Sequence, residues 1–583
     1  MPPVMSSNVL TKSLTGRRWV FREQASGTAA LRSPELLVTN LAIQRGIDLE
    51  HRPTFETLSD PFLLGDMEEA VLRIHHAIAR GETVGIVGDY DADGITGVAQ
   101  LVRFFRRHQQ EPLVILPHRE KDGYGLKREF ISVLHEAGAT LLITVDTGIG
   151  ATEKISEARS LRMDVIVLDH HSLSEELPDA LLVHPLLSTV KSQMSTVHLC
   201  ASGVVFTLLR ALAGRGTKWE GWNEDVALAA IGTVADVVPL LQENRSIVTL
   251  GLQALNDVVC HAEQPELREG VSKHPLFDLV AATRRKDESL TSMHLGFRIA
   301  PRINAAGRMA DPKIALRALL EGGWALEEIV SLNEERQEET FRLLEIAEEK
   351  IQVNNFSIAL ESSEFHLGIV GLIAGKLTER YGRPSLIGSR RGEQITCSLR
   401  SIPEYHIAEA LGRMGPLLLT HGGHAKAGGC TLQLAEWEKL KDAFEQDVRT
   451  ILKGEEPFPT LTVDGELFPS DIFLALTAAL SALEPYGEGN REPRFLLRNQ
   501  TLSSARGVGN EGRHLQCMVS GIKAIGFNLG SLLPKLPPTV DLVCRIGVDT
   551  WQGNVRPQLF IEDIAESKAA PANEPELVIV NCR

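Results

Sequence analysis

Residues 84–94 read Val-Gly-Ile-Val-Gly-Asp-Tyr-Asp-Ala-Asp-Gly, an apolar run that leads directly into three alternating aspartates. Carboxylates this close repel one another, and burying them is costly unless a cation neutralises them. Two further apolar runs end in the same way: Leu141–Val145 leads into Asp146, and Val165–Leu168 leads into Asp169-His170-His171. The pattern predicts that three buried strands deliver their acidic and imidazole side chains to one divalent-metal site at the edge of a parallel sheet.

The segments around these runs alternate between strand and helix patterns. Strands are expected at 83–88, 113–116, 141–146 and 164–169, with amphipathic helices between them. This alternation is typical of an open, mostly parallel α/β sheet. Because ligands of such sheets bind beyond the carboxyl ends of the strands, the acidic residues fall where a site is expected.

A second α/β pattern begins near residue 356 and ends in the glycine-rich stretch 421–429, which we expect to be a loop that allows close approach to a phosphate or carboxylate. Residues 313–352 have the periodicity of a long connecting helix. Short strand-like runs follow residue 457, as in an OB-type barrel. The predicted fold class is therefore α/β, with two α/β lobes joined by a long helix and followed by an OB-like β-barrel.

These patterns give a predicted division of the 583 residues, a length that favours three or four domains. The segments are a lead-in of short helices and loops (1–70), the first α/β domain (71–270), a helical connector (271–352), the second α/β domain (353–455), the OB-like domain (456–567) and a tail (568–583).

Composition excludes some classes of protein. No apolar stretch approaches the ~20 residues that span a bilayer, and the polar start does not resemble a secretory signal. The seven cysteines form no CxxC pair, which favours a reducing, cytoplasmic location and argues against a structural zinc site. The net charge of −16 is only a weak objection to a nucleic-acid partner, because binding follows local basic patches.

Two stretches of the chain are locally basic. Residues 103–128 and 298–317 are rich in lysine and arginine and contain few acidic residues. Their ordinary interpretation is a solvated surface, and the alternative is a phosphate-binding surface.

The candidate metal ligands are Asp89, Asp91, Asp146, His170 and Asp236, with His171 and Asp93 as further candidates. Oxygen-rich ligation with one or two imidazoles suits Mn²⁺ or Mg²⁺ better than zinc, and so many carboxylates favour two ions. Asp236 lies in an apolar segment, where it is either a ligand or a helix-end cap. For Asp93 we favour a cap of the helix that follows it.

These residues lie in stretches that resemble the four motifs of the DHH phosphoesterase superfamily. The stretches are Gly88–Thr96 (GDYDADGIT), Thr144–Ile149 (TVDTGI), Asp169-His170-His171 and Gly232–Leu240 (GTVADVVPL). Further stretches resemble the RecJ single-strand-specific exonucleases with their DHHA1 and OB-like domains. They are Pro117–Arg119, Gly123–Leu126, Ala300–Met309 (APRINAAGRM), Gly368–Ala374 (GIVGLIA), Cys397–Ser401 (CSLRS), Gly422–Gly429 (GGHAKAGG) and Leu483–Asn490 (LEPYGEGN).

The resemblance implies a 5′→3′ exonuclease on single-stranded DNA that depends on Mn²⁺ or Mg²⁺ and acts in repair and recombination. It implies metal ligation by the five residues above and places His171, with Asp146, at the reacting phosphate. Implied nucleic-acid contacts are Arg119, Tyr124, Arg302, Asn304, Arg308, Ser398, Arg400, Ser401, Gly423 and His424. A single-strand-binding protein and a RecQ-type helicase are candidate partners, and the sequence leaves their involvement open.

Four positions depart from the usual family pattern: Gly97, His184, Phe365 and Lys426. None of them removes a proposed ligand. Two other functions stay open at this point. One is hydrolysis of small substrates (cyclic dinucleotides, nanoRNA or pyrophosphate) at the same metal site, and the other is a non-catalytic, replication-associated binding protein.

Overall fold

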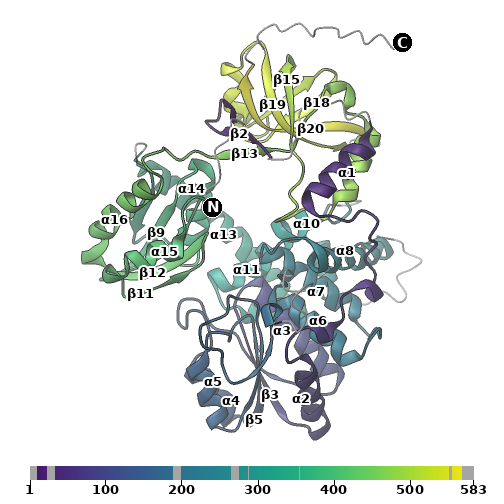
Figure 1. Cartoon of the computed structure of the whole chain (residues 1–583), viewed down its shortest axis with the longest axis vertical. Helices are drawn as coiled ribbons and strands as arrows, with labels where there is room; N and C mark the ends of the chain where they lie inside the picture. Colours follow the sequence, from purple (N-terminus) through teal and green to yellow (C-terminus); the bar gives the residue numbers. More distant parts are fainter. Residues whose placement is uncertain are drawn as a thin grey trace, which may run out of the picture.

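The computed structural model describes residues 9–22, 33–187, 198–263, 275–285, 288–352, 355–550 and 555–567, so the predicted tail 568–583 lies outside it. Figure 1 shows three lobes around a central gap, with the start of the chain packed beside its final domain. Within the described residues, no helix combines the length and apolarity that a membrane span requires.

The first lobe is built on a five-stranded sheet with the order β4-β3-β5-β6-β7. All pairs are parallel, as the alternating pattern predicts. Its strands are β3 (Thr83–Gly88), β4 (Leu113–Ile115), β5 (Ala139–Val145), β6 (Asp164–Leu168) and β7 (Leu181–Val183).

Helices cover both faces of this sheet. One face packs on α2 (Met67–Arg80), α3 (Ala92–Arg107) and α6 (Ala201–Ala213), and the other on α4 (Arg128–Glu136) and α5 (Thr152–Ser160). Burial of both faces explains why the strands are almost continuously apolar. It also leaves the carboxyl edge of the sheet as the place where polar side chains gather.

Two helices differ in extent from what their periodicity predicts. The pattern of residues 225–240 predicts a helix that reaches Leu240, but α7 (Trp222–Ala235) ends earlier because Val237 has a left-handed φ of 60° and Pro239 follows. The connecting helix expected over 313–352 is divided: α12 (Lys313–Leu320) and α13 (Trp324–Glu349) are separated at Gly322 and Gly323, which have φ of 67° and 58°, and α13 is the long helix that leads to the second lobe. The remaining helices of this layer are α8 (Gln242–Glu263), α9 (Pro275–Ala281), α10 (Ser292–His294) and α11 (Ala300–Met309), with a π-helical turn η5 at Leu295–Ile299.

The second lobe carries a mixed sheet with the order β11-β12-β10-β9-β8. Its strands are β8 (Ile358–Ser362), β9 (Ser385–Arg391), β10 (Gln394–Arg400), β11 (Thr420–Gly423) and β12 (Ala427–Gln433), and its main helices are α14 (Val370–Tyr381), α15 (Ile407–Arg413) and α16 (Trp437–Ile451). The glycine-rich stretch expected as a loop is instead largely the antiparallel hairpin β11–β12. Gly423 is needed where the strands approach closely, because a Cβ there would lie 2.5 Å from the Ala427 carbonyl oxygen.

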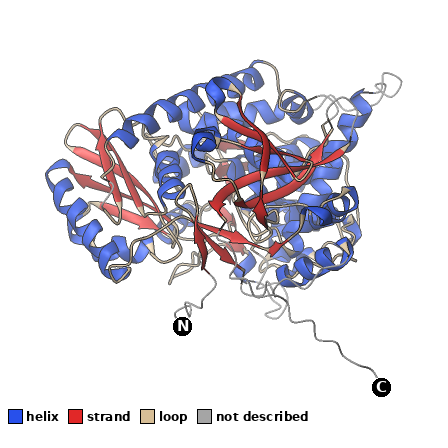
Figure 2. Cartoon of the chain, turned by 90° about the horizontal axis from the view of Figure 1, so that it is seen from above, coloured by secondary structure: helices blue, strands red, loops and turns tan. Residues whose placement is uncertain are grey.

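The C-terminal domain is a seven-stranded sheet with the order β14-β15-β19-β20-β18-β17-β16. The strands are β14 (Gly465–Glu466), β15 (Phe495–Gln500), β16 (Leu502–Val508), β17 (His514–Val519), β18 (Ile522–Gly526), β19 (Val540–Asp549) and β20 (Arg556–Glu566). Seen from above in Figure 2, these strands lie over the helices of the first lobe, and the second lobe stands to one side.

The start of the chain differs from the expected lead-in of helices and loops. It forms two strands, β1 (Val9–Lys12) and β2 (Arg18–Phe21), and β2 pairs with β13 (Thr460–Val463). Helix α1 (Pro34–Arg45) packs on α17 (Leu474–Leu480), and its apolar face joins the core of the C-terminal domain. Sequence patterns miss this because the strand partner lies more than 400 positions away.

Candidate metal centre

The aspartate-rich loop after β3 owes its shape to hydrogen bonds and to one glycine. Asp91 is the N-cap of α3, and its Oδ1 accepts from the N–H groups of Asp93 (3.0 Å) and Gly94 (3.2 Å). A Cβ on Gly94 would lie 2.8 Å from the backbone N and O of Asp89, so no larger residue fits here. The loop therefore projects Asp89 and Asp91 from one tight turn at the carboxyl edge of the sheet.

Asp146 is held in a strained backbone conformation at the end of β5. Its φ of 62° is left-handed, which is uncommon for a residue other than glycine. Its N–H donates to the Leu168 carbonyl at 2.9 Å, which ties it to the end of β6. Strain of this kind is found where a side chain must be aimed at a site.

The structure brings the five predicted ligands, together with His171 and Asp93, to one place. Nε2 of His170 lies 3.2 Å from Oδ1 of Asp146 and 3.6 Å from Oδ2 of Asp236. Three groups have ligand atoms within 4.8 Å of one another: Asp89, Asp91 and Asp146; Asp146, His170 and His171; and Asp93, His170 and Asp236. Asp146 and His170 each belong to two of these groups, so the groups form one continuous cluster.

The chemistry of these side chains fits divalent cations. Oδ1 of Asp89, Oδ1 of Asp146 and Nε2 of His170 are buried without a hydrogen-bond partner. Burial, followed by the neighbouring carboxylates, raises the pKa of Asp89 and Asp146, and it raises the pKa of Asp236 to about 9. Buried acceptors without donors are unfavourable, and a cation bound among them would remove both penalties.

Asp93 caps a helix, but a different helix from the predicted one. Its carboxylate accepts from the N–H groups of Ala201 (2.7 Å) and Ser202 (2.9 Å) at the start of α6, whereas Asp91 caps α3. Its Oδ2 also lies 3.8 Å from Nε2 of His170. Asp93 thus ties α6 to the cluster.

Asp169 is a residue of the centre that we did not single out from the sequence. Its Oδ1 lies 2.7 Å from Nδ1 of His171, and its carboxylate also accepts from the N–H groups of Ile149 and His170. Although burial opposes ionisation, these hydrogen bonds and the His171 charge hold the pKa of Asp169 well below its usual range. The sequence marked Asp169 through its place in the Asp169-His170-His171 stretch directly after β6, but it did not show that Asp169 is the partner of His171.

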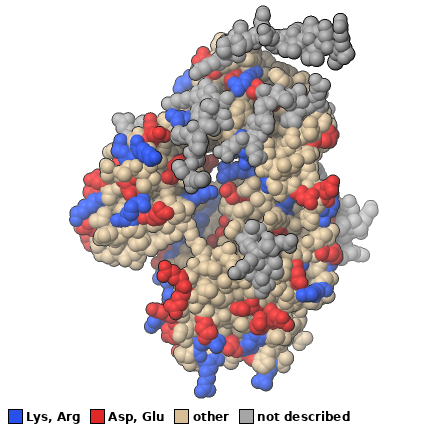
Figure 3. All heavy atoms as spheres, in the orientation of Figure 1, with Lys and Arg blue, Asp and Glu red and all other residues tan. Residues whose placement is uncertain are grey.

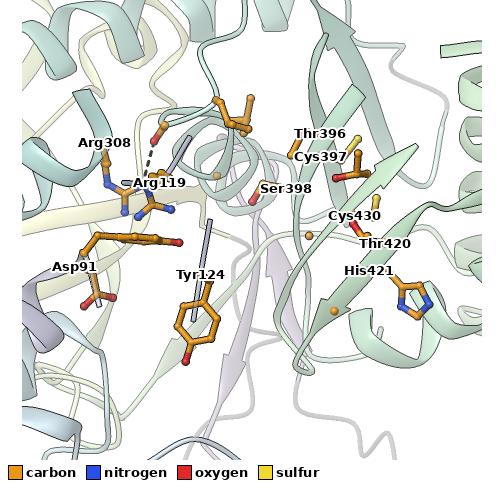
Figure 4. Close-up of a pocket in the computed structure, with 18 of the residues that line it drawn as sticks. Asp91, Arg119, Tyr124, Arg308, Thr396, Cys397, Ser398, Thr420, His421 and Cys430 are labelled. Carbon is orange, nitrogen blue, oxygen red and sulfur yellow. Dashed lines mark hydrogen bonds between the residues drawn. The ribbon is translucent and has the colours of Figure 1, made fainter. Parts of the chain in front are cut away.

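A polar cleft adjoins the cluster and has a volume of about 860 Å³. Figure 4 shows Asp91, Arg119, Tyr124 and Arg308 on one side of it and Ser398 on the other, so both lobes contribute walls. Arg119 stacks 4.0 Å above the Tyr90 ring, Arg308 donates to the Gly368 carbonyl at 3.2 Å, and Arg400 donates to Oγ of Ser398 at 3.2 Å.

Among the described residues, the arginines of the cleft form no ion pair with an acidic side chain. Burial, and then the charges of Arg119 and Arg336, lower the pKa of Arg308 to about 9, and burial also lowers the pKa of Arg400. Within the described chain, neither side chain forms an ion pair with a carboxylate. Figure 3 shows basic side chains gathered in the hollow between the lobes. The arginines that line the cleft from both lobes therefore make it suited to anions.

The other predicted contact residues have varied surroundings. The Tyr124 hydroxyl lies 3.2 Å from the Asp146 carbonyl oxygen, and the His424 ring stacks on that of His171 with centroids 6.3 Å apart. Oδ1 of Asn304 accepts from the Ala92 N–H at 2.9 Å, which fastens α11 to the aspartate loop. Arg302, Ser401 and Gly423 do not line the polar cleft: Arg302 donates to the Arg298 carbonyl, Ser401 to the Tyr405 carbonyl, and Gly423 belongs to β11.

Known proteins share this architecture. A sequence model of the DHH family, N-terminal domain, matches residues 83–233, and one of the RecJ OB domain matches residues 463–563. The chain is 31% identical to the single-stranded-DNA-specific exonuclease RecJ of Dickeya dadantii, over 91% of this chain and 96% of that one. The chain belongs to the RecJ family. The RecJ of Bacillus subtilis is also 31% identical, over 91% of this chain and 68% of the relative.

Solved RecJ structures agree with the fold. A crystal structure of Thermus thermophilus RecJ in complex with Mn²⁺ has a TM-score of 0.78 and 29% identity, covering 92% of this chain and 76% of that one. The same protein in complex with Mg²⁺ has a TM-score of 0.72 and 27% identity, with 92% and 75% covered. These RecJ structures carry the kinds of ion that the cluster described above would suit.

The four departures from the usual RecJ pattern lie close to the site or to its supports. A Cβ on Gly97 would lie 2.7 Å from a Val145 methyl group, so a side chain does not fit without a shift. His184 lies 2.9 Å from the His171 carbonyl oxygen, and Phe365 is buried in the core of the second lobe. Nζ of Lys426 lies 3.6 Å from Glu488 in the loop that precedes β15. All four are accommodated without removing a member of the cluster.

Proposed function

We propose that this chain is a metal-dependent 5′→3′ exonuclease that hydrolyses single-stranded DNA. The observation that carries the proposal is one cleft that adjoins an aspartate–histidine cluster and is lined from both lobes by Arg119, Arg308 and Arg400, which form no ion pair with an acid among the described residues. A phosphodiester bound in this cleft would contact cations held by the cluster and guanidinium groups from both lobes. The named activity of the RecJ relatives supports the choice of a single DNA strand as the substrate.

The metal ligands are proposed to be Asp89, Asp91, Asp146, His170 and Asp236. The overlapping groups favour two Mn²⁺ or Mg²⁺ ions, with Asp146 shared between them. Such a pair lowers the pKa of a bound water and offsets the charge that develops on the attacking and leaving oxygens. The buried atoms of Asp89, Asp146 and His170 that have no hydrogen-bond partner are the positions from which the protein would hold the ions.

His171 is proposed to act on the reacting phosphate. Its ring is partly exposed, and Nδ1 is engaged by Asp169 at 2.7 Å, so the carboxylate fixes which nitrogen faces the cleft. Burial opposes protonation, but the bond to Asp169 outweighs it and raises the pKa of His171. A protonated imidazole can donate a hydrogen bond to a phosphate oxygen, and its orientation is set before the substrate arrives.

Arg119, Arg308 and Arg400, called the arginine set below, are proposed to position the strand. Arg119 and Arg308 lie on the same side of the cleft as Asp91, whereas Ser398 and Arg400 come from β10 of the second lobe. Guanidinium groups bind phosphate oxygens in a bidentate manner, which fixes geometry as well as charge. Binding of the 5′ end at Ser398 and Arg400 would place the first linkage over the cluster and produce 5′→3′ polarity.

The remaining contacts and partners belong to the same proposal. Tyr124, Arg302, Asn304, Ser401, Gly423 and His424 are proposed to contact the strand or to support residues that do. Recruitment by a single-strand-binding protein or a RecQ-type helicase, a cytoplasmic location and the predicted domain boundaries stay predictions.

Strands labelled at either end test the function. With Mn²⁺ present, a 5′-labelled single strand should release labelled mononucleotide at once, and a 3′-labelled strand should shorten stepwise. A blunt duplex and free dinucleotides are the comparison substrates. Release of label first from the 3′ end would refute the polarity, and cleavage of dinucleotides alone would favour a small-substrate phosphodiesterase.

A further inference from the structure

Two arginines on neighbouring helices form no ion pair with any described residue. Arg302 lies on α11 and Arg336 on α13, and these helices pack against each other. Both side chains are half-buried, and Nε of each is buried without a hydrogen-bond partner. Burial, together with the charge of Arg302, lowers the pKa of Arg336. The two like charges therefore interact unfavourably in a partly dehydrated place.

The surroundings of the pair supply only neutral acceptors. Arg336 donates to Oδ1 of Asn333 at 2.9 Å, and Arg302 donates to the Arg298 carbonyl. Glu334 acts on Arg302 electrostatically, but within the described part of the chain neither guanidinium forms an ion pair. Half-buried charges without a counterion reduce stability, so the arrangement points to an anion from outside the chain.

Other arginines in the same region are matched by acids. Arg342, also on α13, lies 2.8 Å from Glu339 and 3.5 Å from Glu364. Arg298, one turn before Arg302, lies 2.7 Å from Glu288. Nearby acids thus neutralise Arg298 and Arg342, whereas Arg302 and Arg336 keep their charges available for another group.

We propose that Arg302 and Arg336 together bind one internal phosphate of the DNA strand, separate from the phosphates held in the polar cleft. The inference rests on the proposed function, because it takes the same strand as the ligand. Neither residue lines the cleft, but both lie next to it: Arg302 shares α11 with Arg308, and Arg336 is close enough to act on Arg308 electrostatically. Two guanidinium groups that share one phosphate offset their mutual repulsion through it.

Binding of a single strand to Arg336→Gln tests the inference. Without divalent metal, this variant should bind a thymidine oligonucleotide several-fold more weakly, and its slope of log affinity against log salt should be smaller by about 1. The loss of affinity should grow with strand length, since only a longer strand brings a phosphate to α11 and α13. Arg342→Gln, which removes the same charge from the same helix, is the matched control and should leave the slope unchanged.

Thermal unfolding with inorganic sulfate separates binding from a structural role. Sulfate should raise the Tm of the wild-type protein more than that of Arg336→Gln, and without an anion the variant should be no less stable than the wild type. A lower Tm without an anion, or a salt slope equal to that of the wild type, would overturn the inference. If the wild-type protein binds single strands without cleaving them, the proposed function fails while this test of a phosphate site still stands.

Discussion

The acidic cluster beside the polar cleft and the arginine set that lines it carry opposite charges but do not neutralise each other. In the cluster, Asp89 and Asp146 are buried with oxygen atoms that accept no hydrogen bond from the described residues. In the arginine set, Arg308 and Arg400 donate to carbonyl and hydroxyl oxygens. Direct ion pairs between the two sets would be the simplest way to neutralise both, and none is formed within the described part of the chain.

This difference shows which ligand each set of charges is suited to bind. Carboxylates with raised pKa values are suited to metal ions, and arginines with lowered pKa values are suited to phosphate oxygens. Metal ions and a phosphodiester together would connect the acidic cluster to the arginine set. Removing a charge from the cluster and removing one from the arginine set are therefore expected to have different effects. Three substitutions test that expectation, and a fourth tests the spacing of the two sides of the cleft.

The largest effect is expected from Asp146→Ala. Because Asp146 belongs to two of the ligand groups, its loss should reduce turnover on the order of a thousandfold or more. Strand binding by the arginine set should be largely kept. Removal of one buried carboxylate also relieves repulsion, so the metal-free Tm should not fall. The measurements are single-strand cleavage and the Mn²⁺-dependent rise in Tm. Asp164→Asn, at an exposed ion pair, is the control, and retention of the Mn²⁺ effect on Tm in Asp146→Ala would contradict the role.

A smaller loss of activity is expected from Asp169→Asn. Asp169 holds His171 through a 2.7 Å contact, and loss of such an orienting carboxylate lowers activity by roughly 10- to 100-fold. The change should appear in kcat with little change in strand affinity. If Asp169→Asn weakened strand binding and left kcat unaltered, Asp169 would act on strand binding rather than on the reacting phosphate.

Arg400→Gln should show the opposite pattern. Loss of one charge-assisted phosphate contact is worth about 1.5–3 kcal/mol, which corresponds to roughly a 10- to 100-fold rise in the Kd or KM for the strand. The Mn²⁺-dependent rise in Tm should be unchanged, because Arg400 lies on β10 of the second lobe, which holds none of the proposed metal ligands. Arg391→Gln, on the exposed end of β9, is the matched control, and an equal effect of both substitutions would mean only a general charge contribution.

The mildest effect is expected from Gly368→Ala, which alters the distance between the walls. A Cβ here would lie 2.1 Å from the Arg308 carbonyl oxygen, so α11 and the start of the second lobe must move apart. We expect a fall of about tenfold in kcat/KM and a modest fall in Tm. Gly412→Ala is the control, since a Cβ at that helical position meets nothing within 4 Å. If both variants behave like the wild type, cleavage does not depend on the spacing of the walls.

Local sequence patterns predicted much of the fold. Each strand of the first lobe that ends in a ligand was predictable from its apolar run, since a parallel sheet buries both faces. Errors arose where the decisive contacts were distant or depended on backbone conformation. Strand β2 needs β13 as its partner, and two glycines with positive φ divide the helix expected over 313–352.

Within the site, the acidic clusters and their convergence followed from the sequence, because carboxyl ends of parallel strands meet at one edge. Three features were decided only by the tertiary structure: the capping of α3 by Asp91 and of α6 by Asp93, the support of His171 by Asp169, and the proximity of Arg302 to Arg336. The physical reason is the distance along the chain over which each feature is determined. Strand positions and ligand types are set by residues adjacent in the chain, whereas hydrogen bonds and electrostatic interactions depend on which side chains packing has brought within a few ångströms.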